Sequence, residues 1–140
     1  HEEGLFPALD WLCHWMQEYY GLNVTLEMDS RVEPEEEVRK TTLFQAAQEL
    51  LVNVAEHSGE EEAKLQCSGA GGGDFRLTVE DDGCGFSPER VREESKKQQS
   101  FGLFNLEERL NLRGGRIQIE SAPGEGTKVT VVLPQGKKVE

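Results

Sequence analysis

The 140-residue sequence has no long hydrophobic run. A membrane helix needs about 20 consecutive apolar residues, and no stretch approaches that length. A charged and then apolar leader of the signal-peptide type is also missing. We therefore expect a soluble, cytoplasmic domain that makes no direct membrane contact, although a larger parent protein could be membrane-anchored.

Basic residues are scarce as well. Lys and Arg total 15 against 27 Asp and Glu, which gives a formal net charge of −12. Nucleic-acid binding is disfavoured, because such domains normally carry a basic patch. The three cysteines, Cys13, Cys67 and Cys84, have no CxxC spacing. Their odd number indicates neither a disulfide framework nor a zinc site and favours a reducing compartment.

What the sequence does contain is a regular succession of helix and strand patterns, without an internal repeat or a domain linker. Periodic apolar residues predict three helices, at 5–20, 42–57 and 101–113, and five strands, at 22–29, 63–69, 74–81, 116–121 and 126–134. This order predicts an α+β two-layer sandwich, with one mixed sheet of about five strands and three helices on one face. Residues 1–140 would form a single domain with a frayed tail at 135–140.

Two charged segments separate these elements. The first, SRVEPEEEVRK at 30–40, predicts a solvated loop before the second helix. Thr42 and Gln45 have the spacing of a capping box, which predicts that this helix starts at about residue 42. The second segment, at 87–100, has little apolar content and predicts a mobile loop.

The segment VEDDGCGF (79–86) ends a strand on two carboxylates. Since strand side chains alternate between faces, Asp81 follows Val79 toward the core side. A buried carboxylate needs a hydrogen-bond donor, either a ligand amine or backbone N–H groups of the next turn. Gly83 and Gly85 allow another group to approach their backbone closely. The residues alone fit either a polar turn or a binding site.

The predicted second helix carries a polar ridge. Glu49, Asn53 and His57 are spaced four residues apart, which places them along one side of the helix. Asn is unfavourable in the middle of a helix, yet its carbonyl oxygen suits a hard cation such as Mg²⁺. A carboxylate one turn earlier could orient a water or a reacting hydroxyl. The alternative is an ordinary solvated face, with His57 packed or capping.

Two further stretches have glycine at the boundary of a predicted element. Gly102 starts the third helix, where free N–H groups favour phosphate. Gly124, Gly126 and Thr127 lie in APGEGTKV, which also fits a simple hairpin turn. Each signal is weak alone, whereas the order of an Asn helix, a DxGxG turn, a Gly-start helix and a GxGT hairpin is specific.

The four stretches together resemble the C-terminal ATP-binding domain of sensor histidine kinases, which belongs with the gyrase, heat-shock chaperone and mismatch-repair ATPases. ELLVNVAEH resembles its N box, DDGCGF its G1 box, FGLFNLEERL its second glycine box and GEGT its last. GLFPALDWL and NLEERL, with a short lid, resemble the subclass of nitrate and membrane-fluidity sensors. The resemblance covers essentially the whole chain and implies a Bergerat-type α/β sandwich.

The resemblance implies a role for each matching residue. Asp81 would accept the adenine amine, and Gly83 and Gly85 would let the base lie close. Asn53 would bind a Mg²⁺ that bridges the phosphates of ATP. Glu49 would be the polar or general-base residue one turn before Asn53.

The remaining residues of the implied nucleotide site come from the lid and its flanks. Gly102 and Leu103 would form the phosphate-side end of the lid, which would run between Phe86 and Phe101 and fold over ATP. Thr127 would close the adenine pocket through its hydroxyl or a water. The implied nucleotide-binding set is completed by His57 and Phe86.

The implied reaction is transfer of the γ-phosphoryl group of ATP to a histidine. His1, His14 and His57 are the only histidines, and none lies in an acceptor-type helix. The partner would therefore be a dimerisation and histidine-phosphotransfer domain absent from this chain, with a response regulator as an indirect partner. We expect the isolated domain to be a monomer.

Two positions depart from the family pattern. Glu56 stands where a basic residue is usual, and Ser100 where the second glycine box usually opens with glycine. They keep open a degenerate nucleotide-binding or interaction module. An ATPase or an anti-sigma-factor serine kinase of the same superfamily is a further alternative, which the short lid and NLEERL disfavour.

Overall fold

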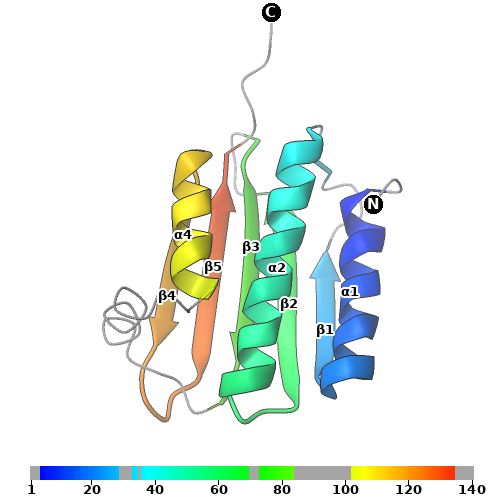
Figure 1. Ribbon diagram of the computed structural model, residues 1–140, viewed down its shortest axis with the longest axis vertical. Helices are drawn as coiled ribbons and strands as arrows, with labels where there is room; N and C mark the ends of the chain where they lie inside the picture. Colours follow the sequence, from blue (N-terminus) through cyan, green and yellow to red (C-terminus); the bar gives the residue numbers. More distant parts are fainter. Residues whose placement is uncertain (1–3, 29–32, 35, 70–72, 84–101, 135–140) are drawn as a thin grey trace, which may run out of the picture.

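The computed structural model describes residues 4–28, 33–34, 36–69, 73–83 and 102–134 (Figure 1). Its helices are α1 (Leu5–Tyr20), α2 (Glu37–His57) and α4 (Gly102–Leu112). Its strands are β1 (Asn23–Met28), β2 (Glu62–Gly69), β3 (Phe75–Asp81), β4 (Arg116–Ser121) and β5 (Thr127–Leu133). The expected lid at 87–100 and tail at 135–140 fall outside the described residues.

The five strands form one mixed sheet in the order β1-β2-β3-β5-β4. β1 pairs with β2 in parallel, because α2 connects them as a crossover, and the other neighbouring pairs are antiparallel. The described helices all cover the same face of this sheet (Figure 1). The predicted two-layer sandwich is therefore confirmed.

The core lies between the sheet and the helices. Leu9, Leu12 and Met16 of α1 are fully buried, as are Leu51 of α2 and Leu77 of β3. Cys13 and Cys67 are free and buried, and burial raises the pKa of the Cys67 thiol to about 12, so these thiols act as apolar side chains. In the described part of the chain, no helix combines the length and hydropathy that a membrane span requires.

The predicted start of α2 is wrong. The helix begins at Glu37, within the segment expected to be a loop, and Thr42 lies inside it with its hydroxyl donating to the Val38 carbonyl at 2.7 Å. Glu, Arg and Lys are good helix formers, and an acidic residue in the first turn complements the helix dipole. Lys40 also pairs with Glu33 at 2.9 Å and with Glu37 at 3.5 Å, which stabilises this first turn.

Candidate functional site

One row of polar side chains crosses the ends of three strands. In the sheet register Asp81 of β3 lies opposite Thr127 of β5, which in turn lies opposite Ser121 of β4. Ser121 Oγ lies 2.8 Å from Thr127 Oγ1 and donates to the Gly126 carbonyl at 3.0 Å. The carboxyl end of α2 lies at this same end of the molecule, and the start of α4 is the end of that helix nearer to it (Figure 1). The structure thus brings segments from all four predicted motifs toward one end of the sheet.

Sequence reasoning missed Ser121. The alternation of RIQIES places Ser121 on the same face as the half-buried Ile117 and Ile119. A hydroxyl that ends such a series, one hairpin before Thr127, is the signal that could have identified it.

Asp81 is buried as the strand alternation predicts, with 7% of its surface exposed. The Gly83 N–H donates to Asp81 Oδ1 at 2.8 Å. Burial raises the pKa of the Asp81 carboxyl above its ordinary value; the Gly83 bond opposes this rise, and the charges of Asp82 and Glu80 add to it. Since no other described residue hydrogen-bonds to this carboxylate, Oδ2 can accept a further donor.

Gly83 and Gly126 are required by close backbone approaches. A Cβ at Gly83 would lie 2.4 Å from the Ser58 carbonyl oxygen at the end of α2. Gly126 has a φ of +77°, and a Cβ there would lie 2.5 Å from the Asp81 carbonyl oxygen. The group that closely approaches Gly83 in the structure is therefore the protein's own α2 terminus.

The predicted polar ridge lies on α2, where Glu49 and Asn53 are half-buried and His57 is exposed. The Glu49 carboxylate is paired with Arg109 of α4, with 2.5 Å between Oε2 and Nη2. Arg109 is the second residue that sequence reasoning missed, since its partner is 60 positions away. The pair connects the ridge to the helix that begins at Gly102.

Glu56, the acid at the usually basic position, is exposed. Of the other predicted residues, Gly85, Phe86 and Ser100 fall outside the described residues, as does the side chain of Leu103. Gly102 is the first residue of α4.

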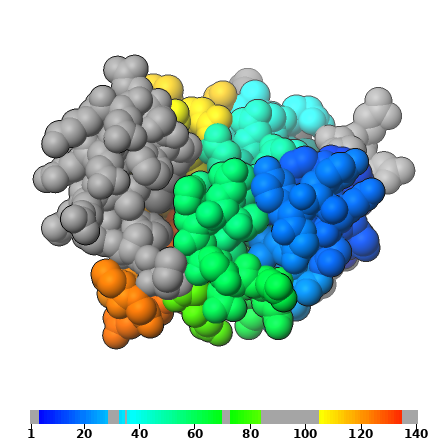
Figure 2. All heavy atoms as spheres, turned by 60° about the horizontal axis from the view of Figure 1, so that its bottom comes forward, coloured from blue at the N-terminus to red at the C-terminus, as the bar shows by residue number. Residues whose placement is uncertain are grey.

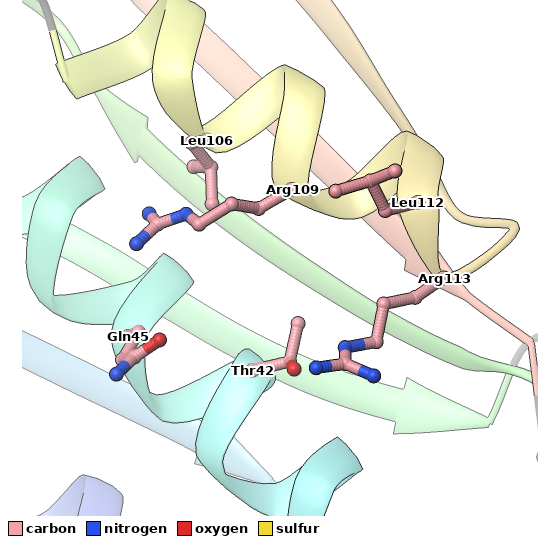
Figure 3. A pocket seen from close by; sticks show the side chains of 6 residues that line it. All are labelled: Thr42, Gln45, Leu106, Arg109, Leu112 and Arg113. Carbon is pink, nitrogen blue, oxygen red and sulfur yellow. The ribbon is translucent and has the colours of Figure 1, made fainter.

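Two cavities flank these residues. One, of about 280 Å³, lies between α2 and α4 and is lined by Thr42, Gln45, Leu106, Arg109, Leu112 and Arg113 (Figure 3). The other, of about 390 Å³, reaches Asp81 and is lined by Thr25, Glu60, Glu62, Ala63, Lys64, Glu80, Asp81 and Asp82. The second cavity touches the polar row only at Asp81. Thr25, Lys64 and Glu80 are register partners, so most of its lining lies on the sheet face opposite to the Asp81 side chain.

The chemistry of the donor set limits how a metal could bind. Among residues 4–28, 33–34, 36–69, 73–83 and 102–134, no group of three or more His, Cys, Asp or Glu side chains could hold a metal ion. Mg²⁺ commonly takes only one or two protein ligands and completes its shell with phosphate and water oxygens. The amide oxygen of Asn53 fits such a partial site, in which a nucleotide would supply most of the ligands.

Comparison with known proteins places these residues in context. Residues 38–137 match the model of the histidine kinase-, DNA gyrase B- and HSP90-like ATPase family. The chain is 33% identical to the signal transduction histidine-protein kinase/phosphatase DegS of Bacillus subtilis, over 94% of this chain and 34% of DegS. It is 28% identical to the nitrate/nitrite sensor protein NarX of Escherichia coli, over 94% of this chain and 21% of NarX.

Solved structures share the fold. The histidine kinase domain of the blue-light-activated kinase from Erythrobacter litoralis superposes with a TM-score of 0.76 and 21% identity, over 94% of this chain and 61% of that one. Histidine kinase AdeS of Acinetobacter baumannii gives 0.75 and 14%, over 96% of this chain and 66% of that one.

Proposed function

Because the chain belongs to the histidine kinase-, DNA gyrase B- and HSP90-like ATPase family, we propose that it is the ATP·Mg²⁺-binding catalytic part of a sensor histidine kinase. It would transfer the γ-phosphoryl group of ATP to a histidine on a dimerisation domain outside these 140 residues. The resemblance drawn from the four sequence stretches is confirmed at the level of the family. The chain spans about a third or less of the curated relatives described above, so the activity of the whole protein is part of this proposal.

The single observation that carries the proposal is the buried Asp81 carboxylate at the end of β3. One oxygen holds the turn through the Gly83 N–H, and the other remains able to accept the exocyclic amine of adenine. A buried carboxylate with spare acceptor capacity is costly to the free fold, and an adenine amine would offset that cost. Thr127 lies beside Asp81 in the register and would contact the base through its hydroxyl.

The phosphate end of the site would lie toward α2 and α4. Asn53 would hold Mg²⁺ through its amide oxygen, and Mg²⁺ when bound would neutralise phosphate charge. His57, Gly85 and Phe86 would complete the nucleotide contacts. Gly102 and Leu103 start α4, where unpaired backbone N–H groups favour phosphate oxygens.

Glu49 would act one turn before Asn53 on the reacting side of the site. Its carboxylate is oriented by Arg109, so the direction in which it can accept a hydrogen bond depends on the position of α4. Catalysis of phosphoryl transfer depends mainly on positioning and charge neutralisation, and this arrangement supplies positioning.

The test combines calorimetric titration of the chain by ATP, with and without Mg²⁺, with a transfer assay. The acceptor in that assay is a separately supplied dimerisation domain that bears the substrate histidine. We expect Mg²⁺-dependent ATP binding and labelling of that histidine. ATP hydrolysis without labelling would indicate a superfamily ATPase, and absence of ATP binding would indicate a degenerate interaction module.

A further inference from the structure

A partly exposed ridge of aromatic rings runs along α1, far in sequence from the polar row, whose residues lie on β3, β4 and β5. Trp11, Trp15 and Tyr19 are spaced four residues apart, and their ring centroids lie 6.3 Å and 5.4 Å apart along the helix. Trp11 is 47% exposed and Tyr19 is 65% exposed, and Phe44 of α2 lies 6.3 Å from the Trp11 ring. These four residues are called the aromatic ridge below.

Trp11 and Trp15 are stacked and the other neighbouring rings are tilted against each other, and such packed rings form a preorganised surface. Each ring is held by its neighbours, so little side-chain entropy remains to be lost when a partner covers them. Tyr and Trp are enriched at binding surfaces because they bury a large area and keep a polar tip. Trp15 and Phe44 also pack against the hydrophobic core, so Trp11 and Tyr19 supply most of the exposed surface of the ridge.

A second ridge beside the first is acidic. Asp10, His14 and Glu18 are also spaced four residues apart, one position before each ring, and all three are exposed. His14 Nδ1 lies 2.8 Å from the Asp10 carbonyl oxygen, which fixes the imidazole along the ridge. Residues 1–30 contain no Lys or Arg. His14 Nδ1 lies 3.9 Å from Asp10 Oδ2 and would balance that carboxylate only when the imidazole is protonated.

We propose that the aromatic ridge and its acidic neighbour form a docking surface for an amphipathic helix whose polar face is basic. The apolar face of that helix would cover Trp11, Trp15 and Tyr19. Its Lys or Arg side chains would lie against Asp10 and Glu18, and over the ring faces, which attract cations.

The shape of the surface also suits a helix. α1 and α2 pack side by side over the sheet, and their surfaces adjoin in the space-filling view (Figures 1 and 2). Phe44 of α2 lies 6.3 Å from the Trp11 ring, so the ridge reaches the junction between the two helices. A partner helix laid along α1 beside that junction would use anchors at i, i+4 and i+7.

The chain carries its own reporter for this surface. Its two tryptophans, Trp11 and Trp15, both lie in the aromatic ridge. Tryptophan emission therefore reports on the ridge alone. An 18-residue peptide of Leu and Lys, with Leu at helical spacing and no aromatic residue, is the probe. We expect it to shift and saturate the tryptophan emission of the wild-type chain.

Matched variants separate the ridge from general attraction between opposite charges, with affinity measured by anisotropy of the fluorescein-labelled peptide. Tyr19→Ser and Trp11→Ala should each weaken binding about tenfold. Asp10→Asn with Glu18→Gln should weaken it about fivefold and flatten its salt dependence. The control pair Glu120→Gln with Glu125→Gln removes the same charge from the exposed β4–β5 hairpin and should leave affinity unchanged, as should Leu112→Ala on α4.

The proposal is independent of nucleotide binding, so Asp81→Asn should bind the peptide as the wild type does. Three results would overturn the proposal. The first is equal loss of affinity in the hairpin control pair, and the second is peptide binding without a change in tryptophan emission. The third is an emission shift that depends on protein concentration alone, which would make a second copy of this chain the occupant.

Discussion

Replacement of Asp81 by Asn should make the free domain more stable and a poorer ATP binder. The side chain is 7% exposed, and Asn keeps an oxygen for the Gly83 N–H while removing the charge. Burial, with the nearby charges of Asp82 and Glu80, disfavours the ionised carboxylate and raises its pKa. We expect the unfolding free energy at neutral pH to rise by about 1 kcal/mol, or about 3 °C in Tm for a domain of this size.

ATP binding should change in the opposite direction. A hydrogen bond from the adenine amine to a charged acceptor contributes about 1.5–3 kcal/mol. Its loss predicts a fall of about 10- to 150-fold in ATP affinity. Thermal unfolding followed by circular dichroism measures the first effect, and calorimetric titration measures the second. Asp82→Asn, which removes the same charge from an exposed neighbour, should change both quantities far less.

The pH dependence of Tm tests whether the charge of Asp81 destabilises the fold. Because folding raises the pKa of Asp81, its ionised form costs stability above the folded pKa, and that cost disappears below the ordinary value of 3.8. The Tm advantage of Asp81→Asn should therefore shrink as the pH falls through the folded pKa. A folded variant with lower Tm and unchanged ATP affinity would show that the carboxylate is purely structural and would refute the reasoning.

Three further sets of substitutions test the packing and the charge around the site. A double-mutant cycle that replaces Glu49 and Arg109 by Ala, followed by urea unfolding, should give a coupling energy of about 0.5–1 kcal/mol, because both side chains are partly exposed. A coupling energy of zero would contradict the contact. Gly126→Ala should lower the unfolding free energy by about 3 kcal/mol, because φ is positive and the new Cβ would clash with the Asp81 carbonyl. Gly124→Ala, which has a positive φ but open space around its Cβ, should lower it by only about 1 kcal/mol, and equal losses would exclude the clash. Glu56→Lys should tighten ATP binding about twofold at low salt, and the gain should vanish at high salt; a gain that persists in salt would mean that this exposed side chain acts by contact.

Local patterns predicted most of the fold. α1 has the bounds that its apolar spacing predicts, because Gly21 adopts the left-handed conformation that ends the helix. The strands follow their alternation, and this also placed Asp81 on the buried face. The start of α2 was misplaced because the charged segment was interpreted as a loop, although Glu, Arg and Lys are good helix formers. The contact from Lys40 to Glu33, which lies outside the helix, could not be predicted from local spacing.

The residues of the candidate site also differ in whether a local pattern could identify them. Asp81, Asn53 and Thr127 were found because each lies in a short motif whose residues are adjacent in sequence. Arg109 and Ser121 contribute through partners in other elements, at separations of 60 positions for Arg109 and across a hairpin for Ser121. No periodicity encodes such contacts, which depend on how α4 and β4 pack against their neighbours.

The close approaches at Gly83 and Gly126 bear on how such domains diverge over evolution. Both glycines accommodate the chain's own backbone, so selection for folding alone would preserve them in a descendant that had ceased to use ATP. Asn53 is different, because it makes no hydrogen bond to any described residue and the fold gives it no evident reason to persist. Drift at position 53 would therefore precede drift at the glycines, and intact glycine motifs would outlive the activity with which they are associated.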